Sequence, residues 1–275
     1  MSDTRTGPLE RRQRTGLKRY LRTPKGLVLT LLCLLLFIGT VDSGTLHGIF
    51  NVCVAVITAV VCDTIALWLQ RYPIRLSDGG LVTAVIVGLV LAADTPITVV
   101  IAATAIAIAS KHVLRIGRKP IFNPAAVGLL AAIVGFHASE SWWGDLSAMP
   151  AWSAAIVLVV GYAIVQRVNK FPQFFSFFAV YLAFFAFEGA FHVTLAADAF
   201  RNPIINSALF LACFMLTDPP TSPARYRHQI GFGAISAIVS GLIYLTFGGL
   251  SYLFIGLLSA NLWKLWITRQ KSVIG

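Results

Sequence analysis

Charged side chains are scarce in this chain of 275 residues: Asp, Glu, Lys and Arg make up 12% of it, whereas 57% is hydrophobic. Soluble globular domains contain about 25% charged residues. The scarcity therefore excludes a soluble globular domain and indicates a protein with many segments in the membrane. Negatively charged residues are the rarer kind: there are 11 Asp and Glu against 22 Lys and Arg, which gives a formal net charge of +11.

Cysteine is also rare, and none of the four cysteines is part of a CxxC pair. Cys33, Cys53, Cys62 and Cys213 all lie inside apolar runs, so we expect small buried or lipid-facing side chains. The sequence has no phosphate loop, no HExxH and no haem-type CxxCH motif. From these absences we expect no bound metal and no set of catalytic residues in this chain.

Apolar runs of membrane-helix type fill the rest of the chain. A transmembrane helix needs about 20 apolar residues, and fewer when it is broken or buried. We expect an all-α polytopic membrane protein with about ten transmembrane helices. The runs cover residues 26–44, 47–69, 79–93, 97–110, 123–138, 151–166, 172–193, 203–217, 229–247 and 250–267. The first is too long for a signal peptide and has no small-residue cleavage site, so we expect it to be retained.

The positions of the basic residues predict the orientation of these spans. With ten spans and both termini inside, 21 of the 22 Lys and Arg lie in inner segments, and Arg201 is the exception. We therefore expect a protein of the bacterial inner (plasma) membrane with both termini in the cytoplasm. The amino-terminal tail covers residues 1–25 and is expected to have no fixed structure, and the carboxyl-terminal tail covers residues 268–275. The basic excess then reflects topology and attraction to the lipid bilayer, and we expect no nucleic-acid partner.

Two short helices end in the same way. One apolar run ends at Leu91-Ala92-Ala93-Asp94-Thr95-Pro96, and another ends at Leu216-Thr217-Asp218-Pro219-Pro220. Asp94 falls on the outer side and Asp218 on the inner side, five spans later, so the two copies have opposite orientations. This arrangement predicts inverted five-helix repeats at about 26–138 and 151–267 in a single membrane domain, 26–267. Non-helical backbone at membrane depth requires a covering of protein or a cavity.

Two segments at the inner ends of helices are candidates for ligand binding. In one, Ser77 and Asp78 precede Gly79; a helix amino terminus with glycines admits an anion, and it is equally consistent with an ordinary helix cap. In the other, Asn123-Pro124 begins a helix after a basic cluster that includes Lys111. The Asn amide suits a flavin edge, but Asn followed by Pro is also plain helix-capping sequence.

Acids inside the spans are candidates for ion or proton coupling. Asp63 lies in the second span and Glu188 in the seventh, one helical turn before His192. Either acid can instead lie near an interface, with Asp63 paired to an arginine. We group Asp63, Asp94, Glu188, Thr217, Asp218 and Thr221 as coupling candidates. Trp142, Trp143 and Trp152 fit an outer interfacial belt.

With these segments placed, the chain resembles the RnfD/NqrB family: the membrane D subunit of Rnf-type electron-transport complexes and, equally, the B subunit of the sodium-translocating NADH:quinone reductase. The resemblance covers about residues 70–265. The matching pieces are Ser77-Asp78-Gly79, Phe122-Asn123-Pro124-Ala125 with Gly128, Phe214-Met215, Thr217-Asp218-Pro219 with Thr221-Ser222, and Leu258 with Ala260-Asn261.

The resemblance implies a ten-helix fold of inverted repeats, related to urea and ammonium channels, and flavin-mediated electron transfer coupled to sodium or proton movement. It implies Asp78, Gly79, Asn123, Pro124 and Lys111 as residues near a non-covalent riboflavin or FMN, with other electron-transport subunits as partners. The Ser/Thr-Gly-Ala-Thr motif that carries covalent FMN is absent, so we expect no covalent flavin. The family's paired asparagines are reduced to Asn123, with Pro120 in the first position.

Two functions remain open from the sequence. The first is an RnfD/NqrB-like membrane subunit, which is at most one part of a redox-driven, ion-translocating oxidoreductase. The second is a small-solute transporter or channel on the same fold without redox chemistry. The second function is linked to natural-product biosynthesis, because the chain most resembles short stand-alone homologues, some of which are found among genes for natural-product biosynthesis.

Overall fold

The computed structural model describes residues 20, 23–75, 77–150, 152–191 and 202–274, and ten α-helices form in that part of the chain. They are α2 (Pro24–Ser43), α3 (His47–Leu69), α4 (Asp78–Val90), α5 (Ile97–Val113), α6 (Pro124–Phe136), α7 (Ser153–Val168), α8 (Phe171–Ala190), α10 (Asn202–Phe210), α11 (Tyr226–Phe247) and α12 (Tyr252–Ile274). A π-helical segment, η2 (Leu211–Leu216), continues α10, and a short 3-10 turn, η1 (Trp143–Asp145), precedes α7. The only strands in these residues are β1 (Arg115–Ile116) and β2 (Lys119–Pro120), which form a small hairpin.

The protein is an all-α polytopic membrane protein, as the sequence predicts. Within the described residues, α2, α3, α8 and α11 are long and apolar enough to cross a bilayer by themselves. The shorter apolar helices are α4, α5, α6, α7 and the segment Ile204–Leu216. The sequence places the end of the last span at residue 267, but α12 continues without a break to Ile274.

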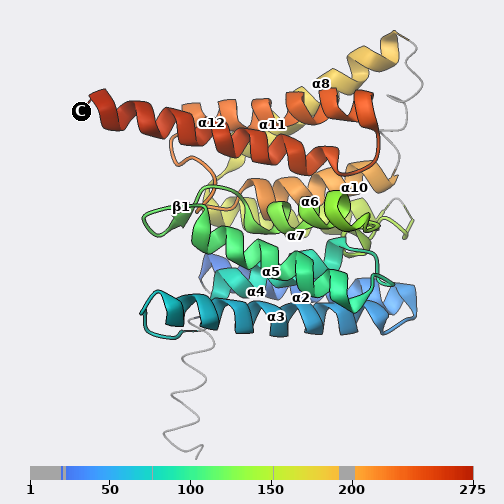
Figure 1. The fold of residues 1–275 in the computed structure, drawn as a ribbon. Coiled ribbons are helices and arrows are strands. Elements are labelled where there is room, and N and C mark those ends of the chain that lie inside the picture. Colours follow the sequence, from blue (N-terminus) through green and yellow to red (C-terminus); the bar gives the residue numbers. More distant parts are fainter. Residues whose placement is uncertain (1–19, 21–22, 76, 151, 192–201, 275) are drawn as a thin grey trace, which may run out of the picture.

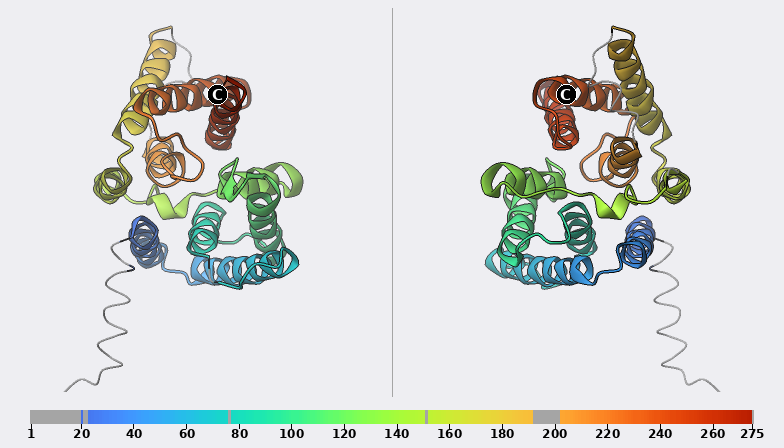
Figure 2. Two further views of the ribbon diagram at one scale, coloured as in Figure 1. Left: turned by 90° about the vertical axis from the view of Figure 1, so that its left-hand side faces the viewer. Right: turned by 90° about the vertical axis from the view of Figure 1, so that its right-hand side faces the viewer.

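The helices form two halves that lie one above the other (Figure 2). In the first half, α3 packs against α4 and α5, α5 packs against α6, and α2 packs against α4. In the second half, the same neighbours recur: α8 packs against η2 and α11, α11 against α12, and α7 against α10. The short α4 and the α10–η2 segment therefore hold corresponding places in their halves.

The connecting loops gather at two ends of the bundle (Figure 1). The hairpin end carries the β1–β2 hairpin, the loops 70–77 and 217–225, and the carboxyl terminus of α12. The far end carries the loops 91–96, 137–152 and 248–251. In the described residues, Lys and Arg occur in or beside the loops of the hairpin end, whereas Asp42, Asp94, Glu140 and Asp145 lie at the far end.

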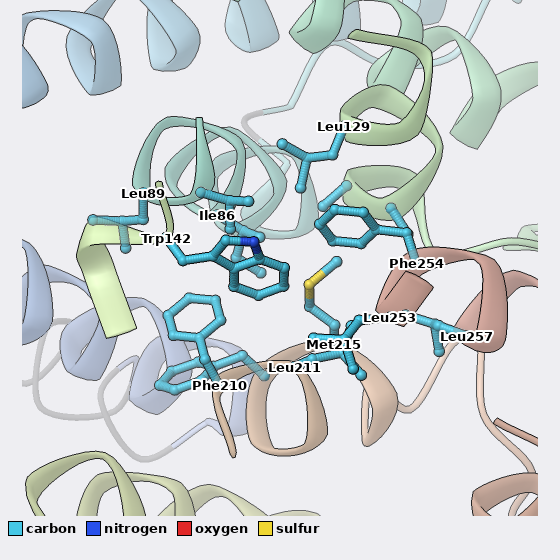
Figure 3. Close-up of a cluster of buried hydrophobic side chains, with 14 of the residues drawn as sticks. Ile86, Leu89, Leu129, Trp142, Phe210, Leu211, Met215, Leu253, Phe254 and Leu257 are labelled. Atoms are coloured by element: carbon cyan, nitrogen blue, oxygen red, sulfur yellow. The ribbon is translucent and has the colours of Figure 1, made fainter. Parts of the chain in front are cut away.

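The centre between the halves is a packed apolar core (Figure 3). Trp142 lies in this core with its side chain 1% exposed, so its assignment to an interfacial belt is wrong; Trp152, 56% exposed, does lie on the surface. The Trp142 ring stacks on Phe254, with ring centroids 5.1 Å apart, and meets Phe210 edge-on. The loop folds inward because the space beyond the end of the short helix α4 has to be filled by protein.

The free cysteines follow the sequence expectation. Cys33 and Cys53 are exposed on the apolar outer surface of their helices, Cys62 is half-buried and Cys213 is buried. None forms a disulfide.

Candidate functional site

The loop 217–225, which follows η2 at the hairpin end, is held by side chains from α12 and from the start of α8. The last carbonyl groups of a helix and those of an irregular loop after it lack intrahelical partners, and in a membrane they need donors from the protein. Four side chains supply them: Gln173 donates to Leu216 O at 2.5 Å, Asn261 to Thr221 O at 3.1 Å, Lys264 to Pro220 O at 2.8 Å, and Lys170 to Pro223 O. Burial lowers the pKa of Lys170 to about 8.

Thr217, Asp218 and Thr221, which the sequence groups as coupling candidates, lie together in this loop. The Thr221 hydroxyl donates to the Asp218 carboxylate at 2.9 Å, and the Thr217 hydroxyl donates to Cys213 O at 2.6 Å. Ser222 donates to the Asp218 carbonyl at 2.8 Å. These bonds make the group a tight turn, and the charges of Lys25 and Lys264 act on Asp218 from outside it.

Asn123 joins the first half to the second. Its Oδ1 caps α6 by accepting from Ala126 N at 3.1 Å, and its Nδ2 donates to Met215 O at 3.2 Å. Its backbone N–H donates to Asn261 Oδ1 at 2.9 Å. The side chain is buried and both of its polar atoms bond within the protein. In this structure Asn123 therefore caps a helix and ties α6 to η2 and α12, and Pro124 is the first residue of that helix.

A groove of about 400 Å³ opens beside this junction at the hairpin end. Its walls are largely apolar, from Ile116, Pro120, Ile121, Pro219 and Leu265, and its polar lining includes Lys119, Arg225, His228, Asn261 and Lys264. The volume lies within the range of about 300–1,000 Å³ that is usual for small-molecule sites. An apolar slot edged by cations is suited to a flat ligand that carries or acquires negative charge.

Asp63 and Lys111 form a second group at the hairpin end, in the first half. Lys111 Nζ lies 3.0 and 2.9 Å from the two carboxylate oxygens of Asp63 and 2.6 Å from Ser77 Oγ. His112 Nε2 lies 2.5 Å from Asp63 Oδ1. A side chain at Gly80 would collide with the Asp63 carboxylate, so that glycine makes room for the acid. Among the residues that the structure describes, the ionic partners of Asp63 are thus a lysine and a histidine rather than an arginine.

The remaining candidates are dispersed. Asp78 is the first residue of α4, and Gly79 follows it with Lys25 Nζ close by. Asp94 is exposed at the far end. Glu188 is half-buried near the end of α8, which extends away from the bundle, and its suggested partner His192 lies outside the described residues. The structure therefore separates the candidates into the group of Asp63 and Lys111, the start of α4 with Asp78 and Gly79, and the 217–225 loop with Asn123 and Pro124. Asp94 and Glu188 lie apart from these groups.

Two acids at the far end, the half-buried Glu140 and the buried Asp145, were not among the candidates. Glu140 accepts from Trp142 Nε1 at 3.0 Å and from Leu250 N at 3.2 Å, and Asp145 accepts from Ser147 N at 2.8 Å and Ser207 Oγ at 2.6 Å. Burial raises the pKa of each to about 7. The sequence shows them only as acids in a short polar loop; the burial arises because the loop folds between the halves.

Glu140 gives a pH-dependent stability. A carboxyl whose pKa is higher in the folded protein favours folding when it is protonated, and this contribution is lost as the pH rises from the ordinary pKa of 4.5 to about 7. We expect thermostability to fall across that interval, by at most about 3 kcal/mol because the group is partly exposed. Glu140→Gln, measured by heating in detergent from pH 4.5 to 8, should flatten that part of the profile. An unchanged slope in the variant would contradict the assignment.

Comparison with known proteins gives two matches. Residues 17–148 match the model of the NQR2, RnfD, RnfE family. A segment of 133 residues is 28% identical to the D subunit of the proton-translocating ferredoxin:NAD(+) oxidoreductase complex of Clostridium ljungdahlii. That segment covers 48% of this chain and 40% of the relative, so the match spans well under half of the relative's length. Both matches agree with the family that the sequence motifs resemble.

Proposed function

We propose that this chain is a member of the NQR2, RnfD, RnfE family, whose model its residues 17–148 match, and that it is a membrane subunit of an Rnf-type electron-transport complex. The relative in Clostridium ljungdahlii is named as one subunit of a larger oxidoreductase complex. The proposal implies partner subunits, because the sequence contains no cysteine motif for a metal cluster and no nucleotide-binding motif.

We propose that the hairpin end faces the cytoplasm of a bacterial inner membrane. The Lys and Arg residues of the described loops gather there, whereas the far-end loops carry Asp94, Glu140 and Asp145 and no described Lys or Arg. Cytoplasmic loops of membrane proteins carry an excess of Lys and Arg. The groove then opens toward the side on which soluble electron carriers are found.

The observation that carries the proposal is the groove beside the 217–225 loop. We propose that it holds a non-covalent flavin, with the ring between the apolar walls and its negative edge or phosphate near Lys119, Arg225 and Lys264. A bound flavin supplies reversible electron transfer. The role of the chain's own residues is to exclude water, orient the ring and stabilise negative charge. Asn123 does not contact the ligand in this proposal, because its amide is hydrogen-bonded to Ala126 N and Met215 O. It holds α6 and η2 together next to the groove.

Coupling to an ion or proton is the finer part of the proposal. Among the acids expected from sequence, Asp63 and Asp218 lie at the hairpin end with cations close to them. A channel between the halves is opposed by the packing, because Trp142, Phe210, Met215 and Phe254 fill the centre. Movement of a solute by that route would require this core to rearrange.

The first test is an absorption spectrum of the protein purified in mild detergent, before and after acid precipitation. We expect flavin bands that move to the supernatant, which indicates non-covalent binding. The double variant Lys119→Gln/Arg225→Gln should bind FMN at least about 100-fold more weakly, because it removes two charge-assisted contacts of about 1.5–3 kcal/mol each. Arg118→Gln is the matched control, since Arg118 belongs to the same hairpin but does not line the groove.

A contrary result has a clear meaning. A protein that is colourless as purified and after incubation with riboflavin or FMN rules out a flavin in the groove. The solute-transporter reading would then be favoured. Equal FMN affinity in the double variant and the wild type would move the flavin away from this groove.

A further inference from the structure

Lys264 is an amine that lines the groove from α12. Its Nζ donates to Pro220 O at 2.8 Å, and Pro220 also lines the groove, so the end of the side chain lies at the groove wall. The side chain is half-buried, and its neighbours on α12 that line the groove include the apolar Leu265. A single backbone carbonyl accepts one hydrogen of an amine. It therefore fixes the nitrogen beside a cavity of about 400 Å³ and, when the nitrogen is neutral, leaves its lone pair available.

The charged groups around Lys264 are mainly cations. Lys119 on the hairpin and Lys170 at the start of α8 both repel it. Asp218 attracts it, but its carboxylate already accepts from the Thr221 hydroxyl at 2.9 Å. Neither of the two ion pairs found in the described part of the chain includes Lys264. A lysine that is partly desolvated and close to other cations has the environment of lysines that act as nucleophiles.

The rest of the groove determines which compounds this amine can meet. Its walls include three prolines, Pro219, Pro220 and Pro223, which give apolar surfaces for a planar ligand. Arg225 and His228 line it as well, and an arginine can bind a phosphate or carboxylate with two hydrogen bonds. A flat, anionic ligand that carries a carbonyl group therefore matches both the walls and the cations. A small neutral aldehyde would gain neither contact.

We infer that Lys264 is a nucleophilic amine that forms an imine with flat, anionic aldehydes or ketones in the groove. The lone pair of Nζ attacks the carbonyl carbon, and a C–N bond forms as the π electrons of the C=O bond move to the oxygen. Both hydrogens of the neutral amine then leave with that oxygen as water, and a C=N bond takes the place of the C=O bond. The exchange needs no oxidant or reductant, and it gives the groove a covalent but reversible hold on its ligand.

This reactivity goes beyond the proposed function and does not rest on it. The amine and the groove are features of the chain whether or not a flavin binds, and imine formation involves no electron transfer. A protein that binds no FMN but forms the imine contradicts the flavin proposal alone. A protein that binds FMN and forms no imine contradicts this inference alone, so the two failures are distinguishable.

The test is trapping of the imine with pyridoxal phosphate, a flat aromatic aldehyde that carries a phosphate. The purified protein is incubated with it at neutral pH and reduced with borohydride, and the label at each lysine is quantified by mass spectrometry. Lys264 should react at least about tenfold faster than Lys119, which lines the same groove but is exposed, because a desolvated amine has a larger neutral fraction. Lys111, paired with Asp63, should react slowly. Pyridoxal without the phosphate should label Lys264 about tenfold more slowly, since it lacks one charge-assisted contact.

Lys264→Arg is the matched variant, because arginine keeps the positive charge and a donor for Pro220 O but forms no stable imine. It should lose most of the rapidly incorporated label. Arg225→Gln should slow the labelling of Lys264 about tenfold, whereas Arg118→Gln, which does not line the groove, should leave it unchanged. The inference is overturned if wild-type Lys264 reacts no faster than Lys119, or if pyridoxal and pyridoxal phosphate label it equally. Both measurements use the wild-type protein, so they decide the question even where a variant does not fold.

Discussion

Trp142→Ala is expected to lower the free energy of unfolding by about 3–5 kcal/mol, the cost of truncating a large aromatic side chain in a core. The Trp142 ring is stacked on Phe254 and edge-on to Phe210, so its removal leaves a cavity between the two halves. It also removes the N–H that donates to Glu140. The midpoint of thermal denaturation should fall by roughly 10 °C in a protein of this size. Size-exclusion chromatography of heated, detergent-solubilised protein measures it.

The matched control is Trp152→Ala, because Trp152 lies close in sequence and is 56% exposed. This variant should stay within about 1 kcal/mol of the wild type, since most surface substitutions have small effects. Similar shifts in the two variants would contradict the central position of Trp142. If a passage through this core carries a solute, Trp142→Ala should also increase flux, whereas the packed centre predicts instability without a new conductance.

Local sequence signals account for the parts of the fold that were predictable. Ser77 and Asn123-Pro124 mark helix starts, and each of the two side chains caps its helix in the structure. The two short helices that end near Asp94 and Asp218 were visible because an acid and a proline interrupt an apolar run. Such signals depend on residues within one helical turn, so a single sequence contains them.

The partners across the bundle were not predictable, for a physical reason. Asp63 and Lys111 are separated by 48 residues, and Asn123 and Asn261 by 138. Hydrophobic periodicity shows which segments are buried but does not specify which polar side chains meet. The Trp142 error has the same origin: a tryptophan beside a membrane span is typical of an interface, and only the three-dimensional course of its loop places it in the core.

The candidate site changes accordingly. The sequence treats Asn123 as a ligand to a flavin or as a cap, and in the structure its amide is engaged as a cap and cross-link. The residues that edge the groove, Lys119, Arg225 and Lys264, were counted from sequence only as topology signals. They were missed because a cation in an inner loop is expected whether or not it binds anything. In the folded protein these cations line one groove beside the 217–225 loop, and the charge pattern of the sequence does not show that they lie together.

Asp63→Asn and Lys111→Met should each destabilise the protein strongly, because each leaves an ionic partner buried without its counter-charge. Breaking a buried ion pair from one side costs about 3–5 kcal/mol. The lower part of that range is expected here, since the Lys111 side chain keeps 20% of its exposure and His112 also contacts Asp63. The double variant Asp63→Asn/Lys111→Met should lose less stability than the sum of the single variants, by about 0.5–3 kcal/mol.

The three variants distinguish a purely structural ion pair from the two roles predicted from the sequence, coupling for Asp63 and cofactor binding for Lys111. A coupling role for Asp63 predicts that Asp63→Asn abolishes ion movement even where Lys111→Met restores stability. A cofactor role for Lys111 predicts loss of FMN binding in Lys111→Met beyond that of Asp63→Asn. If the double variant recovers stability and retains both FMN binding and ion movement, the pair is a structural link between α3 and α5. Additive destabilisation would contradict the ion pair itself, because charges that do not interact have no coupling energy.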